Sequence, residues 1–343
     1  MPHATLRSIQ YHLPEQVLST GDLAKEFPEW PVEKIEAKTG IKCRHIAGPE
    51  ECSSDLAVRA AQKLFDSGVC KPEDIDFVLL CTQSPDYFLP TTACLVQDRL
   101  GIPRSAGALD YNLGCSGYIY GLGLAEGLIA SGQAASVLLL TAETYSKFLH
   151  PEDRSVRTIF GDAAAATWLT AAESATPFLG PFVYGTDGSG GPNLMVPVGG
   201  ARRAPSEETA IAVEDDQGNV RAPENLFMDG PEIFSFTLSA VPECVKALLE
   251  RSAVTLDDID LFVFHQANRY MLNHLRKRLR IPEEKFCLAF ENCGNTVSST
   301  IPIALHEAEK TGQLKPGARV MLVGFGVGYS WGGTLLRWRG NVA

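Results

Sequence analysis

The apolar and polar positions of this chain follow the same order twice. Residues 74–84 read DIDFVLLCTQS and residues 258–268 read DIDLFVFHQAN, and each is an acidic turn followed by an apolar, β-rich run of strand length. A helix-like segment follows each run, at 95–103 in the first copy and at 274–282 in the second. The pattern therefore predicts the same strand and the same helix in both parts of the chain.

The shared order continues through three more elements. A predicted strand leads into a glycine-containing corner (ALDYNLGCSG and LAFENCGNTV), and a helix of small residues and a further apolar strand come next. Gly114 and Gly294 hold matching places in the two corners and are 294 − 114 = 180 positions apart, an offset that sets Cys115 opposite Asn295. Five matched elements in one order indicate an internal duplication.

Two halves that each alternate strands and helices predict a layered α/β fold with parallel or mixed sheets. We place the boundary after residue 175, which gives an N-terminal half at 1–175 and a C-terminal half at 176–343. Residues 176–232 depart from the repeat and are rich in Gly, Pro and charged residues, a composition typical of surface loops and edge strands.

Composition and charge narrow the class of protein. Of the 343 residues, 45% are apolar and 21% are charged, the balance of an ordinary globular chain that can bury a large core. Thirty basic and 41 acidic residues give a net charge of −11, which argues against a nucleic-acid partner. No apolar run reaches the roughly 18 residues that a membrane-spanning helix needs, and the start of the chain has no apolar signal core. We therefore expect neither a nucleic-acid nor a membrane partner.

The cysteines predict the compartment. There are nine, they are scattered along the chain, and no Cys-x-x-Cys pair occurs. This pattern predicts neither a zinc ribbon nor a disulfide framework, so we expect a cytoplasmic protein without a metal.

Cys115 is the most informative residue. It lies in a corner between Gly114 and Gly117, at the predicted start of a helix. The positive end and free N–H groups of a helix favour a thiolate and can donate to a developing oxyanion, so we expect a lowered thiol pKa and a nucleophile here. The alternative is a small buried residue without chemistry, which is what we expect for the other eight cysteines.

Two polar residues of the second copy are candidates for the same site. His265 ends the apolar strand LFVFH, and α/β folds present catalytic side chains at strand ends. Asn295 occupies the corner equivalent to that of Cys115, and a pseudo-twofold axis would bring equivalent corners together. Taken singly, His265 could be structural and Asn295 a turn former. With Cys115 they make a nucleophile, a base or proton donor, and an amide.

The helix after His265 departs from the acidic background. From residue 261 to residue 282 there is no acidic residue, and the stretch holds five cations: Arg269, Arg276, Lys277, Arg278 and Arg280. Arg269, Arg276 and Arg280 share one helical face. A charged face is often only solubilising, and the alternative is a docking surface for an acidic partner.

These motifs occur together in a known family. The chain resembles the β-ketoacyl-acyl carrier protein synthase III family of the thiolase superfamily over essentially its whole length. The motifs that carry the resemblance are TGIKCRHIA, LGCSGY, DRSVRTIFGDAAAA, HQAN, GNTVSSTIP and the terminal KPGARVMLVGFGVGYSWGG. The ordered combination of Cys, His-Gln-Ala-Asn and Gly-Asn-Thr is highly specific.

The resemblance implies a thiolase-like fold of five αβαβα layers, a homodimer, and a reaction without a cofactor. It implies that Cys115 accepts a starter acyl group from acyl-CoA as a thioester. His265 and Asn295 would hold the thioester carbonyl of malonyl-acyl carrier protein while carbon dioxide leaves, and the carbanion would attack the acyl group. Such a Claisen condensation serves fatty acid, specialised lipid or polyketide biosynthesis.

The resemblance also assigns residues around this centre. It implies an oxyanion hole made of the backbone N–H of Cys115 and one from the run Gly326, Val327 and Gly328, in which Val327 replaces the family's middle Gly. It implies carrier-protein docking by Gln266, Asn268 and Arg269, with Arg276 and Arg280 on the same basic helix.

The side that would bind coenzyme A departs from the family. Lys34 stands where housekeeping members carry an adenine-stacking Trp, and Trp30 lies four residues upstream, whereas Arg154 matches the family's other adenine-side residue. Leu89 occupies a position that often carries Phe at the floor of the acyl pocket. The 197–228 region is longer than in compact members. These departures favour a specialised pathway, with longer or branched starters or a carrier-bound donor.

Three other functions stay open on the sequence. An acyl-cysteine could pass its acyl group to an oxygen, nitrogen or non-malonyl carbon nucleophile. The Cys-His-Asn set could belong to a hydrolase, although a papain-like signature is missing. The chain could also be a non-catalytic partner subunit, although such a subunit would be expected to lose the nucleophile.

Overall fold

Two β-sheets with the same strand order form the framework of the computed structural model, which describes residues 2–340. The five-stranded sheet has the order β1-β7-β6-β4-β5 and the four-stranded sheet has the order β8-β15-β14-β13. The strands of the first are β1 (Pro2–His12), β7 (Ala163–Glu173), β6 (Ser136–Glu143), β4 (Phe77–Cys81) and β5 (Gly107–Tyr111). Those of the second are β8 (Leu179–Thr186), β15 (Ser330–Arg337), β14 (Arg319–Gly326) and β13 (Leu261–Phe264).

Strand directions also match between the sheets. In the first sheet β4 is parallel to β5 and β6, while β6–β7 and β7–β1 are antiparallel. In the second sheet β13 is parallel to β14, while β14–β15 and β15–β8 are antiparallel. The predicted duplication is therefore confirmed by the topology. The domain boundary after residue 175 stays a prediction.

The strand predicted at the start of LAFENCGNTV is wrong. Only one parallel bridge, between Phe262 and Phe286, stands where β5 stands in the first sheet. The amide of Gln266 takes up the backbone groups that would extend the sheet: its Nε2 donates to the carbonyl of Cys287 at 3.3 Å, and its Oε1 accepts from the N–H of Ala289 at 2.8 Å. A side chain thus replaces the ladder of a strand.

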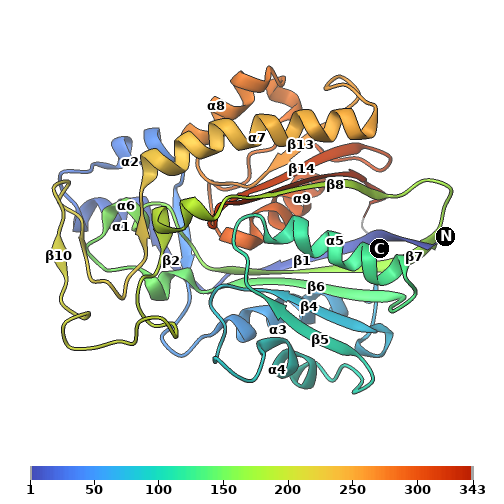
Figure 1. Cartoon of the computed structure of the whole chain (residues 1–343), viewed down its shortest axis with the longest axis horizontal. Coiled ribbons are helices and arrows are strands. Elements are labelled where there is room, and N and C mark those ends of the chain that lie inside the picture. The colour runs from blue at the N-terminus through green and yellow to red at the C-terminus, as the bar shows by residue number, and fades with distance from the viewer. Residues whose placement is uncertain (1, 341–343) are drawn as a thin grey trace.

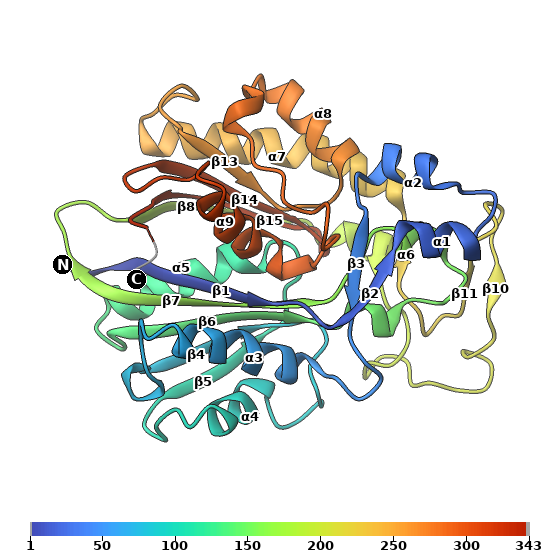
Figure 2. The ribbon, with the colours of Figure 1, turned by 180° about the vertical axis from the view of Figure 1, so that it is seen from behind.

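Helices supply the other three layers (Figure 1). Between the sheets lie α5 (Gly117–Ala130) and α9 (Thr300–Lys310), which Figure 2 shows from behind. The outer face of the first sheet is covered by α3 (Ser53–Asp66) and α4 (Thr92–Arg99), and that of the second by α7 (Gly230–Ser252) and α8 (Arg269–Leu279). The expected five-layered αβαβα arrangement is confirmed.

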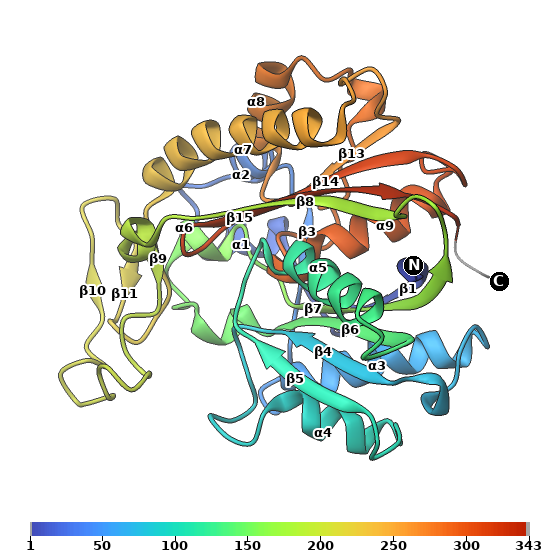
Figure 3. The same ribbon diagram turned by 45° about the vertical axis from the view of Figure 1, so that its right-hand side comes forward.

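The remaining elements gather at one end of the molecule (Figure 3). They are α1 (Thr20–Glu26), α2 (Val32–Thr39), α6 (Arg154–Arg157), and the paired short strands β2 (Gln16–Ser19) with β3 (Cys43–Ile46), β9 (Leu194–Met195) with β12 (Phe227–Met228), and β10 (Val213–Glu214) with β11 (Val220–Arg221). Short 3-10 turns occur at Pro72–Asp74, Tyr145–Phe148, Gly188–Asn193, Glu283–Lys285 and Val297–Ser299.

The central helices are buried by both sheets. Ile119 and Leu122 of α5 and Ile301 of α9 are fully buried, and they pack with Leu139 of β6 and Leu322 of β14 in one apolar cluster. This packing fixes where the N-terminal ends of α5 and α9 point. Across residues 2–340, no helix combines the length and apolar character that crossing a membrane requires.

Candidate active site

Cys115, His265 and Asn295 line one cavity of about 610 Å³. Cys115 lies just before α5, His265 follows β13, and Asn295 lies five residues before α9. Because α5 and α9 are equivalent helices in one layer, their N-terminal corners face the same space. Apolar side chains make much of the rest of the wall: Phe160, Leu194, Ile233, Phe234, Met271 and Phe325. The structure thus brings together the three candidates that the sequence predicts.

Cys115 is buried, with an exposed fraction of 6%. The end of β14 lies directly against it, since a Cβ on Gly326 would be 2.9 Å from the sulfur, so only glycine fits there. Burial, with a smaller contribution from Glu143, raises the pKa of the Cys115 thiol to about 12, although the backbone N–H groups of Cys115 and Val327 act to lower it. The predicted low pKa is therefore wrong, because desolvation outweighs the N–H groups at the helix end.

His265 is a buried, neutral imidazole. Burial lowers its pKa to about 3, so it carries no charge near neutral pH. Its Nδ1 lies 2.7 Å from Oγ1 of Thr300, and its ring packs edge-on against Phe325 at 5.4 Å between ring centroids. Oγ1 of Thr300 also lies 3.0 Å from the carbonyl oxygen of Val297, so its one proton has two acceptors in reach. In the tautomer in which this hydroxyl donates to Nδ1, the ring proton is on Nε2 and is available to a ligand.

Asn295 presents its amide nitrogen beside that imidazole. Its Nδ2 is 3.5 Å from Nε2 of His265, and its Oδ1 accepts from the N–H of Val297 at 2.9 Å. The bond to Oδ1 fixes which way the amide faces. Val297 has a φ of 55°, an unfavourable conformation for a β-branched residue, which the surrounding contacts, this hydrogen bond among them, must stabilise.

The backbone of the same corner is anchored to the first half. The N–H of Asn295 donates to the carbonyl of Ile159 at 2.9 Å, and its carbonyl accepts from the N–H of Gly161 at 3.0 Å. Residues from both halves therefore hold the amide in position.

The predicted docking residues separate into two groups. Gln266 is 1% exposed and its amide is occupied internally, so it offers no contact to a docked protein, contrary to prediction. Asn268 lines the cavity and caps α8 by accepting from the N–H of Met271. Three arginines reach the surface to different extents: Arg269 and Arg276 are partly exposed and Arg280 is exposed.

The residues predicted for the coenzyme A side and for the acyl pocket do not line the cavity that holds Cys115. Lys34 is exposed, with its Nζ 4.9 Å from the ring centroid of Trp30. Arg154 ion-pairs with Glu29. Leu89 is 83% exposed and does not line the cavity of the single chain, so its place at the pocket floor stays a prediction.

Sequence reasoning missed Thr300 and Glu143. Thr300 contacts Nδ1 of His265. In the sequence it is one of several hydroxyl residues in GNTVSSTIP, and nothing distinguishes it from the others. Glu143 is fully buried and ends β6, and burial raises the pKa of its carboxyl to about 8. An acidic residue that closes the apolar run ASVLLLTAE was the available signal.

No group of three or more His, Cys, Asp or Glu side chains within residues 2–340 could hold a metal ion. All nine cysteines are free thiols.

Comparisons with known proteins agree with this geometry. Residues 109–188 match the family described as 3-oxoacyl-[acyl-carrier-protein (ACP)] synthase III, and residues 249–338 match its C-terminal part. The β-ketoacyl-[acyl-carrier-protein] synthase III of Caldanaerobacter subterraneus subsp. tengcongensis is 37% identical over 330 residues, which cover 95% of each chain.

Two solved structures extend the likeness. A 3-oxoacyl-(acyl-carrier-protein) synthase III structure at 2.1 Å has 55% identity and a TM-score of 0.97, over 98% of this chain and 100% of the other. The priming β-ketosynthase of the R1128 polyketide biosynthetic pathway has 28% identity and a TM-score of 0.84, over 99% and 97%.

Duplicated sheets that meet at a Cys-His-Asn cavity define a thiolase-like condensing enzyme. Similarity along nearly the whole length narrows the class further. The chain belongs to the β-ketoacyl-[acyl-carrier-protein] synthase III family.

Proposed function

We propose that this protein loads a starter acyl group onto Cys115 and condenses it with a malonyl-carrier protein, with loss of carbon dioxide, to give a 3-oxoacyl-carrier protein. The observation that carries the proposal is the meeting of Cys115, His265 and Asn295 in one largely apolar cavity. The apolar wall suits an acyl chain, and the three polar groups suit the reacting thioesters.

In the first half-reaction, the sulfur of Cys115 attacks the carbonyl of a starter thioester. A new bond to sulfur forms, the bond to the donor's sulfur breaks, and the thiol proton ends on the leaving thiol. Because the pKa of the Cys115 thiol is about 12, the proton leaves as the attack proceeds. The N–H groups of Cys115 and Val327 then stabilise the negative oxygen of the tetrahedral intermediate.

In the second half-reaction, the Nε2–H of His265 and the Nδ2–H of Asn295 donate to the carbonyl oxygen of the malonyl thioester. Carbon dioxide leaves, and the electron pair of the broken bond remains as an enolate on that oxygen. The enolate carbon attacks the acyl-cysteine, and collapse of the intermediate releases the sulfur of Cys115, which takes a proton from water. A neutral imidazole serves here because it donates without first having to lose or gain a proton.

The charge of α8 supports a carrier protein as the partner. The malonyl-carrier protein docks on α8, where Arg269, Arg276 and Arg280 follow the Asn268 that lines the cavity. The chain acts as a homodimer in the cytoplasm, in fatty acid, specialised lipid or polyketide biosynthesis, and its chemistry needs no cofactor.

The first test is the intact mass of the protein after incubation with starter thioesters. Wild-type protein and Cys94→Ala, which removes an exposed cysteine, should gain one acyl group, and Cys115→Ala should gain none. Asn295→Ala should still be acylated but should give no 3-oxoacyl product with the malonyl-carrier protein. An adduct on Cys115→Ala, or an acyl product formed with another nucleophile in place of malonyl-carrier protein, would refute the proposal.

A further inference from the structure

A two-stranded hairpin borders the cavity on the side away from α8. It consists of β10 and β11 with the turn between them, and it belongs to the segment that Figure 3 shows standing at one end of the molecule. Four of its side chains line the cavity: Asp215, Gln217, Asn219 and Arg221. Neither the catalytic triad nor the docking helix uses this hairpin.

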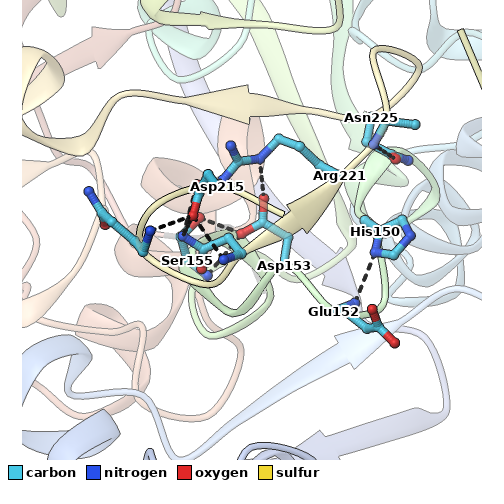
Figure 4. Close-up of polar contacts among 10 residues, drawn as sticks. His150, Glu152, Asp153, Ser155, Asp215, Arg221 and Asn225 are labelled. Carbon is cyan, nitrogen blue, oxygen red and sulfur yellow. Dashed lines mark hydrogen bonds and ion pairs between the residues drawn. The ribbon is translucent and has the colours of Figure 1, made fainter. Parts of the chain in front are cut away.

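Ion pairs fasten the hairpin to the cap of α6 (Figure 4). Arg221 donates through Nε to Asp153 at 2.7 Å and through a terminal nitrogen to Asp215 at 2.8 Å. Asp153 is 1% exposed, and it also accepts from the N–H of Ser155. The Asp215 carboxylate further accepts from the N–H groups of the turn, at 2.9 Å from Gln217. The hairpin is therefore a fixed wall and not a loose loop.

The turn of this hairpin covers Arg154. One terminal nitrogen of Arg154 donates to the backbone carbonyl of Gln217, and the other pairs with Glu29. A Cβ on Gly218 would be 2.7 Å from the same guanidinium, so the backbone itself lies against it. Arg154 retains only 16% side-chain exposure.

Trp30 is likewise covered. The guanidinium carbon of Arg154 is 5.7 Å from the centroid of its ring, and the Nζ atoms of Lys34 and Lys38 are at 4.9 Å and 5.1 Å. A base stacked between an indole and a guanidinium needs about 7 Å between them, since each contact takes about 3.5 Å. No base fits between Trp30 and Arg154 as they stand.

The two arginines at this side are both paired with carboxylates, and Lys34 and Lys38 add two further cations beside Trp30. Glu29 compensates Arg154, and Asp153 and Asp215 compensate Arg221. Neither arginine is left to neutralise the phosphates of a nucleotide. Across the mouth of the cavity, α8 presents a cationic face. Its first residue, Arg269, is 43% exposed in its side chain and pairs with the equally exposed Glu291 only at 3.7 Å.

We propose that the starter thioester reaches Cys115 on the phosphopantetheine arm of a carrier protein and that the β10–β11 hairpin closes the place that the nucleotide of coenzyme A would need. The inference rests on the proposed function, since it names the donor of its first half-reaction. Only the phosphopantetheine arm passes the hairpin into the cavity, and the carrier protein itself stays outside, against α8.

Three donors with one acyl group test this: acyl-pantetheine, acyl-CoA and an acyl-carrier protein. The measured quantity is kcat/KM for acylation of Cys115, followed by intact mass in quenched samples. We expect acyl-CoA and acyl-pantetheine to agree within about threefold and the acyl-carrier protein to exceed both by about tenfold or more. A tenfold advantage of acyl-CoA over acyl-pantetheine, or an acyl-carrier protein no better than acyl-pantetheine, would overturn the inference. Acylation by none of them would instead refute the proposed function, and the inference with it.

Removing the hairpin should open the nucleotide place. In one variant, two glycines replace residues 212–221 and Asp153→Asn removes the buried charge that Arg221 leaves behind. We expect its ratio of acyl-CoA to acyl-pantetheine kcat/KM to rise about tenfold, with acylation by acyl-pantetheine retained as evidence of folding. A retained pantetheine rate with an unchanged ratio would count against the hairpin.

Two single substitutions test the role of the hairpin side without removing the hairpin, in case the shortened chain misfolds. Glu29→Gln frees one side of Arg154, whereas Glu33→Gln removes an exposed carboxylate of α2. The same ratio should rise severalfold in Glu29→Gln and stay at the wild-type value in Glu33→Gln. Equal ratios in both would show that compensation of Arg154 does not select the donor.

Discussion

Two opposing effects act on the sulfur of Cys115. Its own N–H and that of Val327 favour the thiolate, but interactions at a helix terminus are worth only about 0.3–2 kcal/mol. Burial outweighs them, since a rise in the thiol pKa from 9.0 to about 12 corresponds to roughly 4 kcal/mol against the charged form. The N–H groups of this corner therefore serve the oxyanion of the tetrahedral intermediates more than a resting thiolate. The sequence predicts the helix end but not the depth at which it is buried.

Glu143 gives a prediction about pH at the same scale. Its carboxyl accepts from the N–H of Gln83 at 3.0 Å, from Oγ of Ser84 at 3.2 Å and from Oγ of Ser298 at 2.8 Å. Burial raises the pKa of the carboxyl from 4.5 to about 8. The folded chain therefore keeps a proton that the unfolded chain loses above pH 4.5, and stability falls as the pH rises to 8. The loss from this group amounts to roughly 4–5 kcal/mol.

Glu143→Gln keeps the shape of the neutral carboxyl and cannot ionise. We measure the free energy of unfolding of both proteins with urea. The difference, Glu143→Gln minus wild type, should increase from pH 4.5 to pH 8.5. Glu33→Gln, at an exposed carboxylate, controls for the loss of one negative charge and should follow the wild type. A constant difference between Glu143→Gln and wild type across this range would contradict a protonated Glu143.

At the scale of elements, the sequence predicts what depends on local periodicity. The run LFVFH becomes β13 with His265 at its end, and the corner before α5 carries Cys115, because buried strands and helix starts leave clear patterns. The strand predicted after α8 is wrong because the backbone of this segment pairs with the side chain of Gln266, which is 21 positions from Cys287 in sequence. Such a long-range substitution of a side chain for a strand leaves no local pattern.

The basic helix α8 gives the prediction for an element. Arg269→Glu reverses a charge beside the opening of the cavity, so we expect it to raise KM for the malonyl-carrier protein about tenfold at low salt. Acylation by acyl-pantetheine, which has no protein to dock, should keep its rate. The effect should shrink as ionic strength rises, because the charges are exposed.

Arg278→Glu is the matched control for this helix. Arg278 is exposed on the same element, but it lies about half a turn of the helical wheel away from Arg269. Its variant should leave KM for the malonyl-carrier protein near the wild-type value. Equal effects of the two reversals would indicate overall charge and not a docking face.

At the scale of the molecule, duplication explains why the site is readable from the sequence at all. One offset of 180 pairs the corners of Cys115 and Asn295, and the common layer of α5 and α9 turns that pairing into proximity. The end of the molecule that holds β10 and β11 has no counterpart in the repeat. Its anchoring through Arg221 and Asp153 joins residues 68 positions apart, whereas composition alone predicted surface loops and edge strands without their contacts.

The loop before α4 gives the last prediction, on assembly. Three consecutive apolar side chains stand out from it, with exposed fractions of 62% for Tyr87, 86% for Phe88 and 83% for Leu89. Beside it, β5 is an edge strand of the first sheet, with Leu109 37% exposed. An apolar projection next to a sheet edge favours a partner surface, and we expect a dimer with twice the 37.1 kDa mass of the chain.

Light scattering on the eluted protein measures that mass directly. The double variant Phe88→Asp and Leu89→Asp would bury two charges in the interface, so we expect it to elute as a monomer. Ile211→Asp, which changes an equally apolar residue with 60% exposure near the hairpin, should remain a dimer. A monomeric wild type, or a double variant that keeps the dimeric mass, would show that this loop does not hold two chains together. In that event the exposed loop would need another partner, because three apolar side chains in water are unfavourable by themselves.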